Sequence, residues 1–374
     1  MQKPKIRILF TIPNFVTAGS GREMVNIIER LDKNIFEPMI CVETEGGAVF
    51  EELQLKGYKV VVNCFTVHAK GIVGVISNAR QIANSFKQYK IDVWQSFNWS
   101  SDYSEALVAK LSGAKYVYVK KNMNWERRAW KVKSFFSNAI VARNTTMFRT
   151  FFKAPYLSRK TFYIPGGVDT QKFCKNRSVR IRAKYNIPES SFLITCIAQL
   201  VRVKNQLILI KAAAELKEVY VLLIGAARDE EYAKELNSLI DKQQTRDRVQ
   251  LIGALPNVAE ILNASDAFVL PTTNVGGHEE GSPVALLEAM AAEVPCIASN
   301  VSGNRDLIST NETGILFQPH NLEELVASIK KYMNKPDYAS TMASNARKQV
   351  MKENTLDIEA ESFMNMYKKI LRIK

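Results

Sequence analysis

Residues 266–290 contain a strand-like run, Asp266-Ala267-Phe268-Val269-Leu270-Pro271, and, after a polar loop, the stretch Glu280-Gly281-Ser282-Pro283-Val284-Ala285-Leu286-Leu287-Glu288-Ala289-Met290. Proline suits the first turn of a helix, so we expect a helix to begin near Ser282–Pro283. A helix that begins at the carboxyl end of a parallel strand offers free amides and the positive end of its dipole to an anion. The stretch therefore predicts a phosphate site in a strand–loop–helix unit.

The same alternation of strand and helix patterns runs through the chain twice. Apolar runs of strand length alternate with amphipathic stretches over residues 6–142 and again over 192–332, and the segment Ile164-Pro165-Gly166-Gly167-Val168-Asp169 separates the two series. Such alternation implies right-handed crossovers and parallel sheets. We predict an α/β fold of two Rossmann-like, doubly wound domains, residues 1–166 and 167–374, that face each other across a cleft. The last helix can pack back on the first domain.

The composition is that of a soluble globular chain with an excess of positive charge. The net charge of +14 predicts an anionic partner, such as nucleic acid, an acidic lipid surface or a phosphorylated substrate. No apolar run approaches the roughly 18 residues that span a bilayer. The N-terminal segment passes directly into the strand-like run Ile6–Ile12, which is unlike a signal peptide. We therefore expect a cytoplasmic protein.

Cysteine and histidine give no pattern of a metal site. The five cysteines form no Cys-x-x-Cys pair, and several lie in apolar runs, so we expect buried, reduced side chains. Histidine is rare and shows no clustering, which argues against a zinc site in the protein. The chain contains the cysteines Cys41, Cys64, Cys174, Cys196 and Cys296 and the histidines His68, His278 and His320.

Two carboxylates frame the predicted phosphate site. Glu280 precedes the helix, and Glu288 lies about a turn and a half into it. A carboxylate at Glu288 can accept two hydrogen bonds from a ribose diol, and Glu280 can do the same for sugar hydroxyls. Alternatively, both are solvated charges beside an amphipathic helix. The agreement of strand, glycine, helix start and the following strand-like run 294–299 favours the binding site.

This segment, with its Glu-x7-Glu arrangement, resembles the donor-site signature of retaining glycosyltransferases of the GT-B fold, specifically glycosyltransferase family four, or glycosyltransferases group 1. The resemblance covers nearly the whole chain, because further motifs follow in the order of that family. They are Gly19-Ser20-Gly21 after the first strand, Ile164–Asp169 at the domain junction, Leu200, Lys204, Gly225, Gly253, Gly303 and Gly314.

The resemblance assigns roles to individual residues. Lys204 matches the lysine that grips the donor diphosphate, Glu288 the ribose-binding glutamate, and Glu280 the glutamate next to the donor sugar. It further implies donor contacts from Gly281, Ser282, Pro283 and Val284, and from the glycine-rich turn Gly19, Ser20 and Gly21. Taken alone, Lys204 would be an exposed lysine at a helix start, and Gly19–Gly21 an ordinary turn.

Family members of this type lack an Asp-x-Asp metal site, and none is visible in this sequence. The resemblance therefore implies no metal cofactor, and the nucleotide sugar is a substrate. Side chains and the helix terminus would neutralise the charge that develops on the leaving phosphate. That phosphate can itself act as the base, so no protein nucleophile is required.

The sequence departs from the family pattern at three places. Gln199 stands where the family has an arginine, so Arg202 substitutes for it or Lys204 and the helix carry more of the diphosphate binding. No histidine follows the fifth strand; Lys121 or Asn122 can face the acceptor side instead, or both belong to a surface loop. The loop 272–279, which contains His278, is longer than usual and can form a lid over the donor sugar, or be simply exposed.

A basic segment with interleaved aromatic residues lies in the first domain. Residues 115–160 contain twelve Lys or Arg and one acid, Glu126. Such a segment fits an anionic membrane face or nucleic acid, or forms ordinary amphipathic helices with aromatic residues in the core. Because the first domain binds the acceptor in this family, we favour peripheral contact with the inner membrane face and expect no nucleic acid.

We therefore expect a retaining glycosyltransferase that moves a sugar from a UDP- or GDP-sugar to a glycan or lipid-linked acceptor in cell-surface polysaccharide or glycolipid synthesis. One alternative is a nucleotide-sugar epimerase or hydrolase of the same architecture, against which the scarcity of histidine argues. Another is a non-enzymatic, basic protein that binds nucleic acid or membranes. That alternative leaves Glu280 and Glu288 unexplained.

Overall fold

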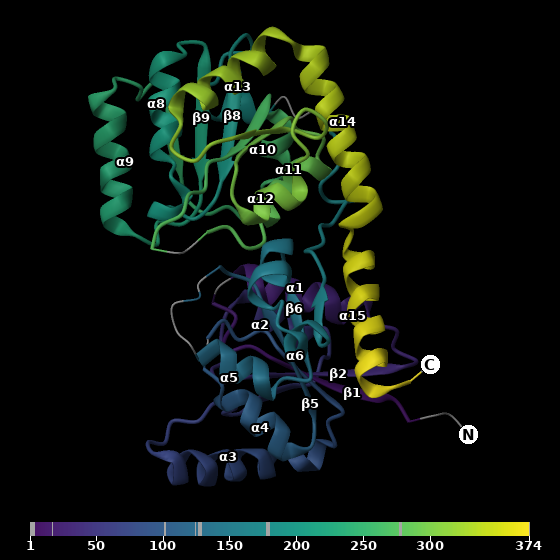
Figure 1. Ribbon diagram of the computed structural model, residues 1–374. Helices are drawn as coiled ribbons and strands as arrows, with labels where there is room; N and C mark the ends of the chain where they lie inside the picture. Colours follow the sequence, from purple (N-terminus) through teal and green to yellow (C-terminus); the bar gives the residue numbers. More distant parts are fainter. Residues whose placement is uncertain are drawn as a thin grey trace. The chain divides into compact units, whose positions relative to one another are not determined.

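The computed structural model describes residues 4–16, 18–100, 102–123, 125, 129–176, 180–276 and 279–373. The chain divides into two compact units. The first comprises Met1–Lys121, Trp125–Pro165 and Leu356–Lys374, and the second comprises Asn122–Asn124 and Gly166–Thr355. Each unit has a parallel sheet and flanking helices (Figure 1).

The first unit contains a seven-stranded parallel sheet with the order β3-β2-β1-β4-β5-β6-β7. Chain order reverses between β1 and β4, which are neighbours in register from Ile8 and Val93 to Thr11 and Ser96. The strands are β1 (Ile6–Thr11), β2 (Phe36–Val42), β3 (Val60–Val62), β4 (Val93–Ser96), β5 (Lys115–Lys120), β6 (Ala139–Ala142) and β7 (Thr161–Tyr163).

The second unit repeats this plan with six parallel strands in the order β10-β9-β8-β11-β12-β13. Its reversal lies between β8 and β11, where Ala267 pairs with Ile194. The strands are β8 (Phe192–Ile197), β9 (Val219–Ile224), β10 (Val249–Ile252), β11 (Ala267–Leu270), β12 (Cys296–Ser299) and β13 (Ile315–Phe317). The predicted α/β fold of two doubly wound parallel sheets is confirmed.

Helices of different lengths flank the sheets of the two units. Those of the first unit are α1 (Ala18–Arg30), α2 (Ala48–Leu55), α3 (Ile72–Phe86), α4 (Ser104–Ser112), α5 (Ala129–Phe136), α6 (Pro155–Ser158) and α15 (Leu356–Leu371). Those of the second are α7 (Arg180–Lys184), α8 (Leu207–Glu215), α9 (Glu230–Lys242), α10 (Ala259–Ala264), α11 (Val284–Ala291), α12 (Ser302–Leu307), α13 (Leu322–Asn334) and α14 (Pro336–Glu353).

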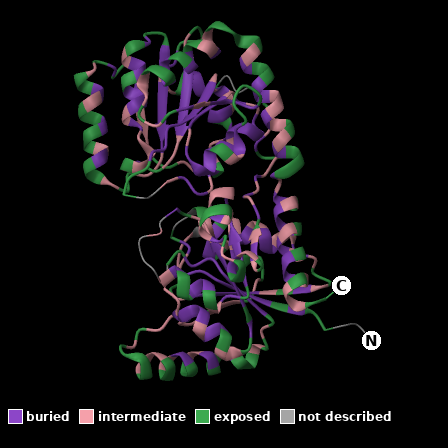
Figure 2. Ribbon diagram, viewed as in Figure 1, coloured by how far each residue is buried: buried purple, intermediate pink, exposed green. Residues whose placement is uncertain are grey.

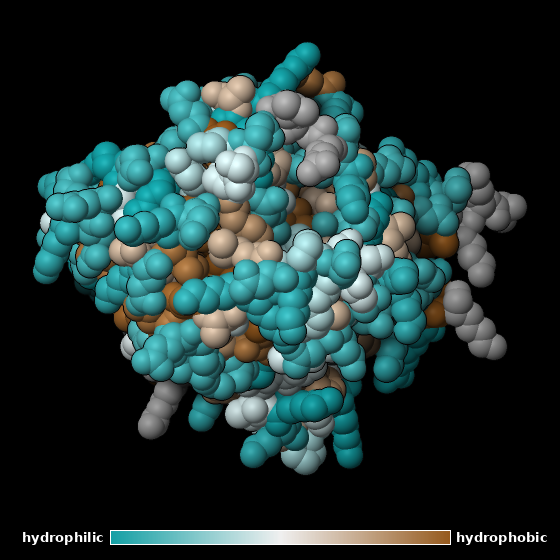
Figure 3. Space-filling model, turned by 90° about the horizontal axis from the view of Figure 1, so that it is seen from above, coloured by the Kyte–Doolittle hydropathy of each residue, from teal (hydrophilic) through white to brown (hydrophobic). Residues whose placement is uncertain are grey.

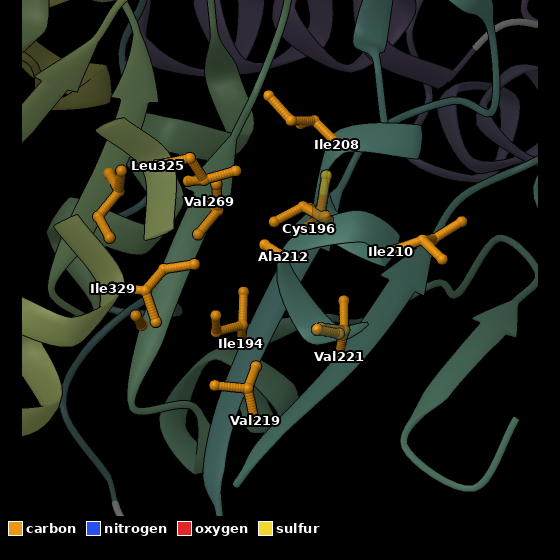
Figure 4. Close-up of a cluster of buried hydrophobic side chains, with 14 of the residues drawn as sticks. Ile194, Cys196, Ile208, Ile210, Ala212, Val219, Val221, Val269, Leu325 and Ile329 are labelled. Atoms are coloured by element: carbon orange, nitrogen blue, oxygen red, sulfur yellow. The ribbon is translucent and has the colours of Figure 1, made fainter. Parts of the chain in front are cut away.

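Both faces of the second sheet are buried, because successive side chains of a strand point to opposite faces. In β11, Ala267 and Val269 join the core beneath α8 and α13, whereas Phe268 and Leu270 join the core beneath α11. Figure 4 shows the first of these cores, where side chains of β8, β9 and β11 meet those of α8 and α13. Figure 2 shows the buried strands between helices whose outer faces are exposed.

The last helix, α15, belongs to the first unit, although α14 belongs to the second. Its Tyr367 hydroxyl donates to Gln95 Oε1 at 3.0 Å in the interior of the first unit, and Asp357 pairs with Arg30 of α1 at 3.0 Å. The two segments that join the units run side by side. Val168 N–H donates to the Asn354 carbonyl at 2.8 Å, and Asn354 Nδ2 donates to the Gly166 carbonyl at 3.1 Å.

No helix within the described ranges combines the length and the apolar character that a membrane crossing requires. The face seen in Figure 3 is mostly hydrophilic, with small hydrophobic patches between polar side chains.

We expect Gly225→Ala to destabilise the second unit by about 3 kcal/mol, because overpacking against a fixed backbone forces it to shift. Gly225 follows β9, and a Cβ atom there would lie 2.0 Å from the Ala198 carbonyl oxygen. The matched control is Gly253→Ala, after the neighbouring strand β10, where a Cβ atom would meet nothing within 4 Å. Urea unfolding of both variants checks this, and equal midpoints would contradict it.

Candidate functional site

The loops that follow β8 and β11 meet beside the reversal of the second sheet. In doubly wound folds, ligands bind beyond the carboxyl ends of the strands at this point, because the crossovers to either side diverge there. The Thr273 N–H donates to the Val203 carbonyl at 2.8 Å and so ties the two loops together. The side chains that these loops carry therefore come together.

Lys204 and Glu280 form an ion pair at this point. Lys204 ends a short 3₁₀ turn, Arg202–Lys204, after β8, and its Nζ donates to Glu280 Oε2. The Thr272 hydroxyl donates to the same oxygen at 3.3 Å. Glu280 is buried and the Lys204 side chain is 22% exposed, so the pair borders on solvent. The two residues that the sequence assigned to the donor site are thus in direct contact.

A second glutamate fixes the loop that carries Glu280. Glu279 Oε2 accepts hydrogen bonds from the Ser302 N–H at 3.1 Å and the Ser302 hydroxyl at 2.5 Å. Burial raises the pKa of Glu279, but these hydrogen bonds, another from Asn274 and the charge of Arg305 together outweigh burial and leave the pKa below its ordinary value. The Gly303 N–H donates to the Glu280 carbonyl at 3.1 Å. The predicted lid residue His278 lies outside the described residues.

Helix α11 begins later than the sequence predicted. Its first residue is Val284, and Pro283 is the cap, with φ −81° and ψ 77°, so proline precedes the first turn. The Val284 N–H donates to the Ser282 carbonyl at 3.0 Å. A local turn therefore satisfies this amide in the present conformation, and the donor contacts of Gly281–Val284 stay a prediction.

Glu288 lies in α11 between buried apolar residues. Burial raises the pKa of its carboxyl to about 7, and the positive charge of Lys172 opposes this only in part. Its neighbours Leu287 and Ala289 are in the core. A carboxylate in such a place is costly unless it gains hydrogen-bond donors. A ligand with a diol would supply them.

The two residues proposed to support Lys204 lie apart from Glu280. The Arg202 guanidinium pairs with Glu235 at 2.6 Å and with Asp229 at 3.6 Å, and it lies over the Tyr232 ring. It is thus directed toward α9 and its N-terminal cap. Gln199 is exposed, and its backbone carbonyl accepts from Gln206 Nε2 at 2.9 Å. In this structure, Lys204 alone of the three reaches Glu280.

In the first unit, the glycine-rich segment is helical. The expected turn at Gly19–Gly21 is wrong, since α1 already begins at Ala18. A Cβ atom at Gly21 would lie 2.7 Å from the Phe15 ring, so glycine permits close packing of the preceding loop. At Gly19, by contrast, a Cβ atom would meet nothing within 4 Å, so the start of α1 is open there.

Lys121, which follows β5, belongs to a buried group of charges. Its Nζ lies 2.8 Å from Glu23 Oε2 and 4.5 Å from the Phe97 ring centroid. Burial lowers the pKa of Lys121 to about 7, and Glu359 opposes this effect. Arg143 also pairs with Glu23 and, at 2.6 Å, with Glu359.

Sequence reasoning missed Glu23, Arg143 and Glu359, which α1, the end of β6 and α15 bring together. Their distant positions along the chain carry no local signal. The other candidate, Asn122, is exposed and is grouped with the second unit.

Comparison with known proteins agrees with this architecture. Residues 178–349 match the family described as Glycosyl transferases group 1, which confirms the resemblance seen in the sequence over that region. A glycosyltransferase from Rickettsia africae has the same fold, with a TM-score of 0.86 at 21% identity and full coverage of both chains. Anabaena HepE in complex with UDP and glucose superposes with a TM-score of 0.83 at 19% identity, over 96% of this chain and 98% of that one.

Sequence relatives cover less of the chain. The UDP-Gal:alpha-D-GlcNAc-diphosphoundecaprenol alpha-1,3-galactosyltransferase of Escherichia coli is 26% identical over 214 residues, which are 56% of this chain and 54% of that protein. The chain spans about half the length of the curated relatives that it matches. The GT-B fold prediction is confirmed by the full-length structural matches.

We expect Glu288→Gln to stabilise the protein at pH 8 by up to about 3 kcal/mol. The folded protein keeps the Glu288 proton up to a pKa of about 7, whereas the ordinary value is 4.5. The folded protein therefore binds more protons than the unfolded protein, so the free energy of unfolding falls as the pH rises from 4.5 to 7. Glu288→Gln removes this loss of stability. Urea unfolding of the variant and the wild type at about pH 5 and about pH 8 measures the difference.

The control for this prediction is Glu260→Gln, which changes an exposed glutamate of α10. It should leave the pH dependence of wild-type stability unchanged. A pH profile of Glu288→Gln that runs parallel to the wild-type profile would show that Glu288 carries no raised pKa.

Proposed function

We propose that this chain is a retaining glycosyltransferase that moves a hexosyl group from a UDP- or GDP-sugar to a glycan or lipid-linked acceptor, in the synthesis of a cell-surface polysaccharide or glycolipid. The observation that carries the proposal is the Lys204–Glu280 pair beside the sheet reversal, with α11 and Glu288 following directly in the chain.

The pair suggests how the donor is received. Before the donor binds, Glu280 neutralises Lys204. A diphosphate carries more negative charge than one carboxylate, so Lys204 exchanges Glu280 for the phosphate oxygens. Glu280 is then free to accept hydrogen bonds from the sugar hydroxyls. Thr272, which donates to Glu280, keeps that carboxylate at the site during the exchange.

The ribose anchors the other end of the nucleotide. The raised pKa of Glu288 reflects a half-buried side chain whose carboxyl has lost part of its water. Two ribose hydroxyls donate to the ionised form, which favours the carboxylate and restores part of its solvation. Nucleotide binding and proton release from Glu288 are therefore coupled, and binding strengthens as pH rises through about 7.

Transfer breaks the bond between the anomeric carbon and the phosphate oxygen and forms a bond to the acceptor oxygen. The acceptor attacks from the face that the nucleotide leaves, and its proton passes to the departing phosphate. Lys204 and the N-terminus of α11 stabilise the charge on that phosphate, because both are fixed before the reaction. Configuration at the anomeric carbon is retained without a protein nucleophile.

The relatives support a uridine nucleotide as the first donor to test. The Escherichia coli relative is named for UDP-Gal and a diphosphoundecaprenol-linked acceptor, and the Anabaena structure contains UDP. By analogy we propose Lys121 of the first unit and the adjacent Asn122 as candidate contacts of a lipid-linked acceptor. The charges around Lys121 hold its side chain in place.

The first unit also offers a narrower membrane-facing surface than the sequence suggested. Trp130 and Phe152 are buried, and the half-buried Trp125 packs against both, so these aromatic residues are turned to the protein interior. Lys133 is buried and donates to the Ser100 carbonyl at 3.0 Å. Exposed residues remain on and near α5, and we propose that they contact an anionic membrane: Lys131, Val132, Phe135, Arg149, Lys153, Tyr156 and Arg159.

We expect Lys204→Ala to weaken UDP binding by about 10- to 100-fold, because a charge-assisted hydrogen bond is lost and Glu280 remains as an unpaired charge. Isothermal titration with UDP, and thermal stabilisation by UDP- and GDP-sugars, measure the effect. The control is Lys211→Ala, an exposed lysine of α8, which should bind UDP like the wild type.

Three results would overturn the proposal. The first is indifference of the wild-type protein to every nucleotide and nucleotide sugar. The second is conversion of the donor to an epimer or to free sugar in the presence of a lipid-linked acceptor, which would favour an epimerase or hydrolase. The third is salt-sensitive binding to RNA without any nucleotide effect, which would favour a basic binding protein.

For the membrane surface, we expect Phe135→Ser to lower binding to phosphatidylglycerol-containing vesicles by about 10-fold, because an exposed aromatic side chain no longer enters the interface. Phe135 is 66% exposed, and the control Leu55→Ser changes another exposed apolar residue of the first unit, on α2. Vesicle flotation measures binding. Equal flotation of both variants, or equal binding to uncharged vesicles, contradicts the assignment.

A further inference from the structure

Three side chains that suit a soft or borderline metal ion meet beyond the carboxyl ends of β2 and β3. Glu43 directly follows β2, and Cys64 and His68 lie between β3 and α3. A carboxylate oxygen of Glu43, the Cys64 sulfur and a ring nitrogen of His68 all lie within 4.8 Å of one another. The group belongs to the first unit and is independent of the proposed sugar transfer.

The Glu43 carboxylate is already held in place. Its Oε1 accepts hydrogen bonds from the Thr66 hydroxyl at 2.6 Å, the Thr66 N–H at 3.2 Å and the Phe65 N–H at 3.4 Å. Hydrogen bonds of this kind orient the ligands of metal sites, and their donors lie outside the coordination sphere. Within the described chain these donors all reach Oε1, so Oε2 is the oxygen that remains for an ion.

The other two ligands can adjust. Cys64 is half-buried, and its thiol donates to the Thr66 carbonyl at 3.0 Å, while its sulfur lies 3.9 Å from Glu43 Oε1. His68 is exposed at the protein surface, so its ring can turn without displacing core residues. In a tetrahedral zinc site the ligand atoms are about 3.5 Å apart, given metal–ligand distances of about 2.0–2.3 Å. The His68 and Cys64 side chains would rotate to bring the three ligand atoms this close.

We propose that Glu43, Cys64 and His68 bind a zinc ion, with water in the fourth position. One thiolate, one imidazole and one carboxylate suit zinc, whereas magnesium and calcium prefer oxygen ligands alone. Binding requires that Cys64 loses its proton, so one proton is released per ion. The ion ties the loop after the short edge strand β3 to the end of β2 and thereby stabilises that edge of the sheet.

The sequence contained part of this signal. Cys64 and His68 form a Cys-x3-His pair, but Glu43 is 21 residues earlier than Cys64. Cys41, two residues before Glu43, is buried, and its thiol donates to the Asn63 carbonyl at 3.5 Å. The expectation that histidine takes part in no cluster considered only the other histidines. Parallel pairing of β2 with β3 brings Glu43 to the pair.

The test uses the full-length, untagged wild-type protein with Co²⁺ as a spectroscopic probe and with Zn²⁺. We expect one equivalent of Co²⁺ to produce a thiolate-to-cobalt charge-transfer band and tetrahedral visible bands, both of which Zn²⁺ removes. Zn²⁺ should also slow alkylation of Cys64, located by peptide mass mapping, by about 10-fold or more and raise Tm. The alkylation experiment needs no variant, so a folding defect cannot obscure it.

Cys64→Ser and His68→Ala should each lose the charge-transfer band or weaken Co²⁺ binding by about 10-fold or more, because each removes a ligand. The control Cys174→Ser, a half-buried cysteine of the second unit, should bind Co²⁺ like the wild type. Absence of a charge-transfer band in the wild type, an unchanged band in Cys64→Ser, or alkylation of Cys64 at the same rate with Zn²⁺ would each overturn the site. UDP binding measured in parallel separates this result from the proposed function.

Discussion

The strands of both sheets pair in parallel, and most other features of the two units follow from this pairing. Parallel strands need crossover connections, and right-handed crossovers from the first strand of each unit build the sheet outward in one direction and then in the other. Chain order must therefore reverse once in each sheet, between β1 and β4 and between β8 and β11. The loops at the reversal diverge, so polar side chains can gather there without disturbing the buried strands.

In the second unit, the reversal of strand order brings together two charged side chains whose pairing a ligand can change. Lys204 and Glu280 reach each other from adjacent strand ends, and the pair borders on solvent. Glu280 is buried and Lys204 is partly exposed, so loss of Lys204 would leave Glu280 as a buried charge without its partner. Under the proposed function, a donor phosphate that replaces Glu280 would find the positive charge of Lys204 already in position.

In the first unit, the charges are more deeply buried. Arg143 has no exposed side-chain surface, Glu359 almost none, and Glu23 joins them to Lys121. Removing one member of such a group leaves a buried charge without its partner, which costs several kcal/mol. Because Glu359 comes from α15, the last helix is tied to the first unit by this group as well as by apolar packing. The arrangement makes Lys121 a fixed feature of the unit and not a mobile surface lysine.

Local patterns in the sequence were enough to predict two series of alternating strands and helices and the segment of the proposed donor site. Apolar runs, glycines and the stretch from Glu280 to Glu288 are such patterns, because backbone preference and burial act on neighbouring residues. Helix α11 begins one residue after Pro283, and α1 already includes Gly19–Gly21, where the sequence predicted a turn. Pro283 caps α11, and Gly21 packs against Phe15. These effects depend on contacts that the hydrophobic pattern of the sequence does not contain. Which side chains meet depends on the tertiary structure. The strand order brings Lys204 into contact with Glu280, whereas Arg202 pairs with Glu235 of α9. Parallel pairing of β2 with β3 brings Glu43 close to Cys64 and His68. Residues far apart in the chain carry no local preference for one another, so their contacts follow from the order of the strands and from the packing of the helices.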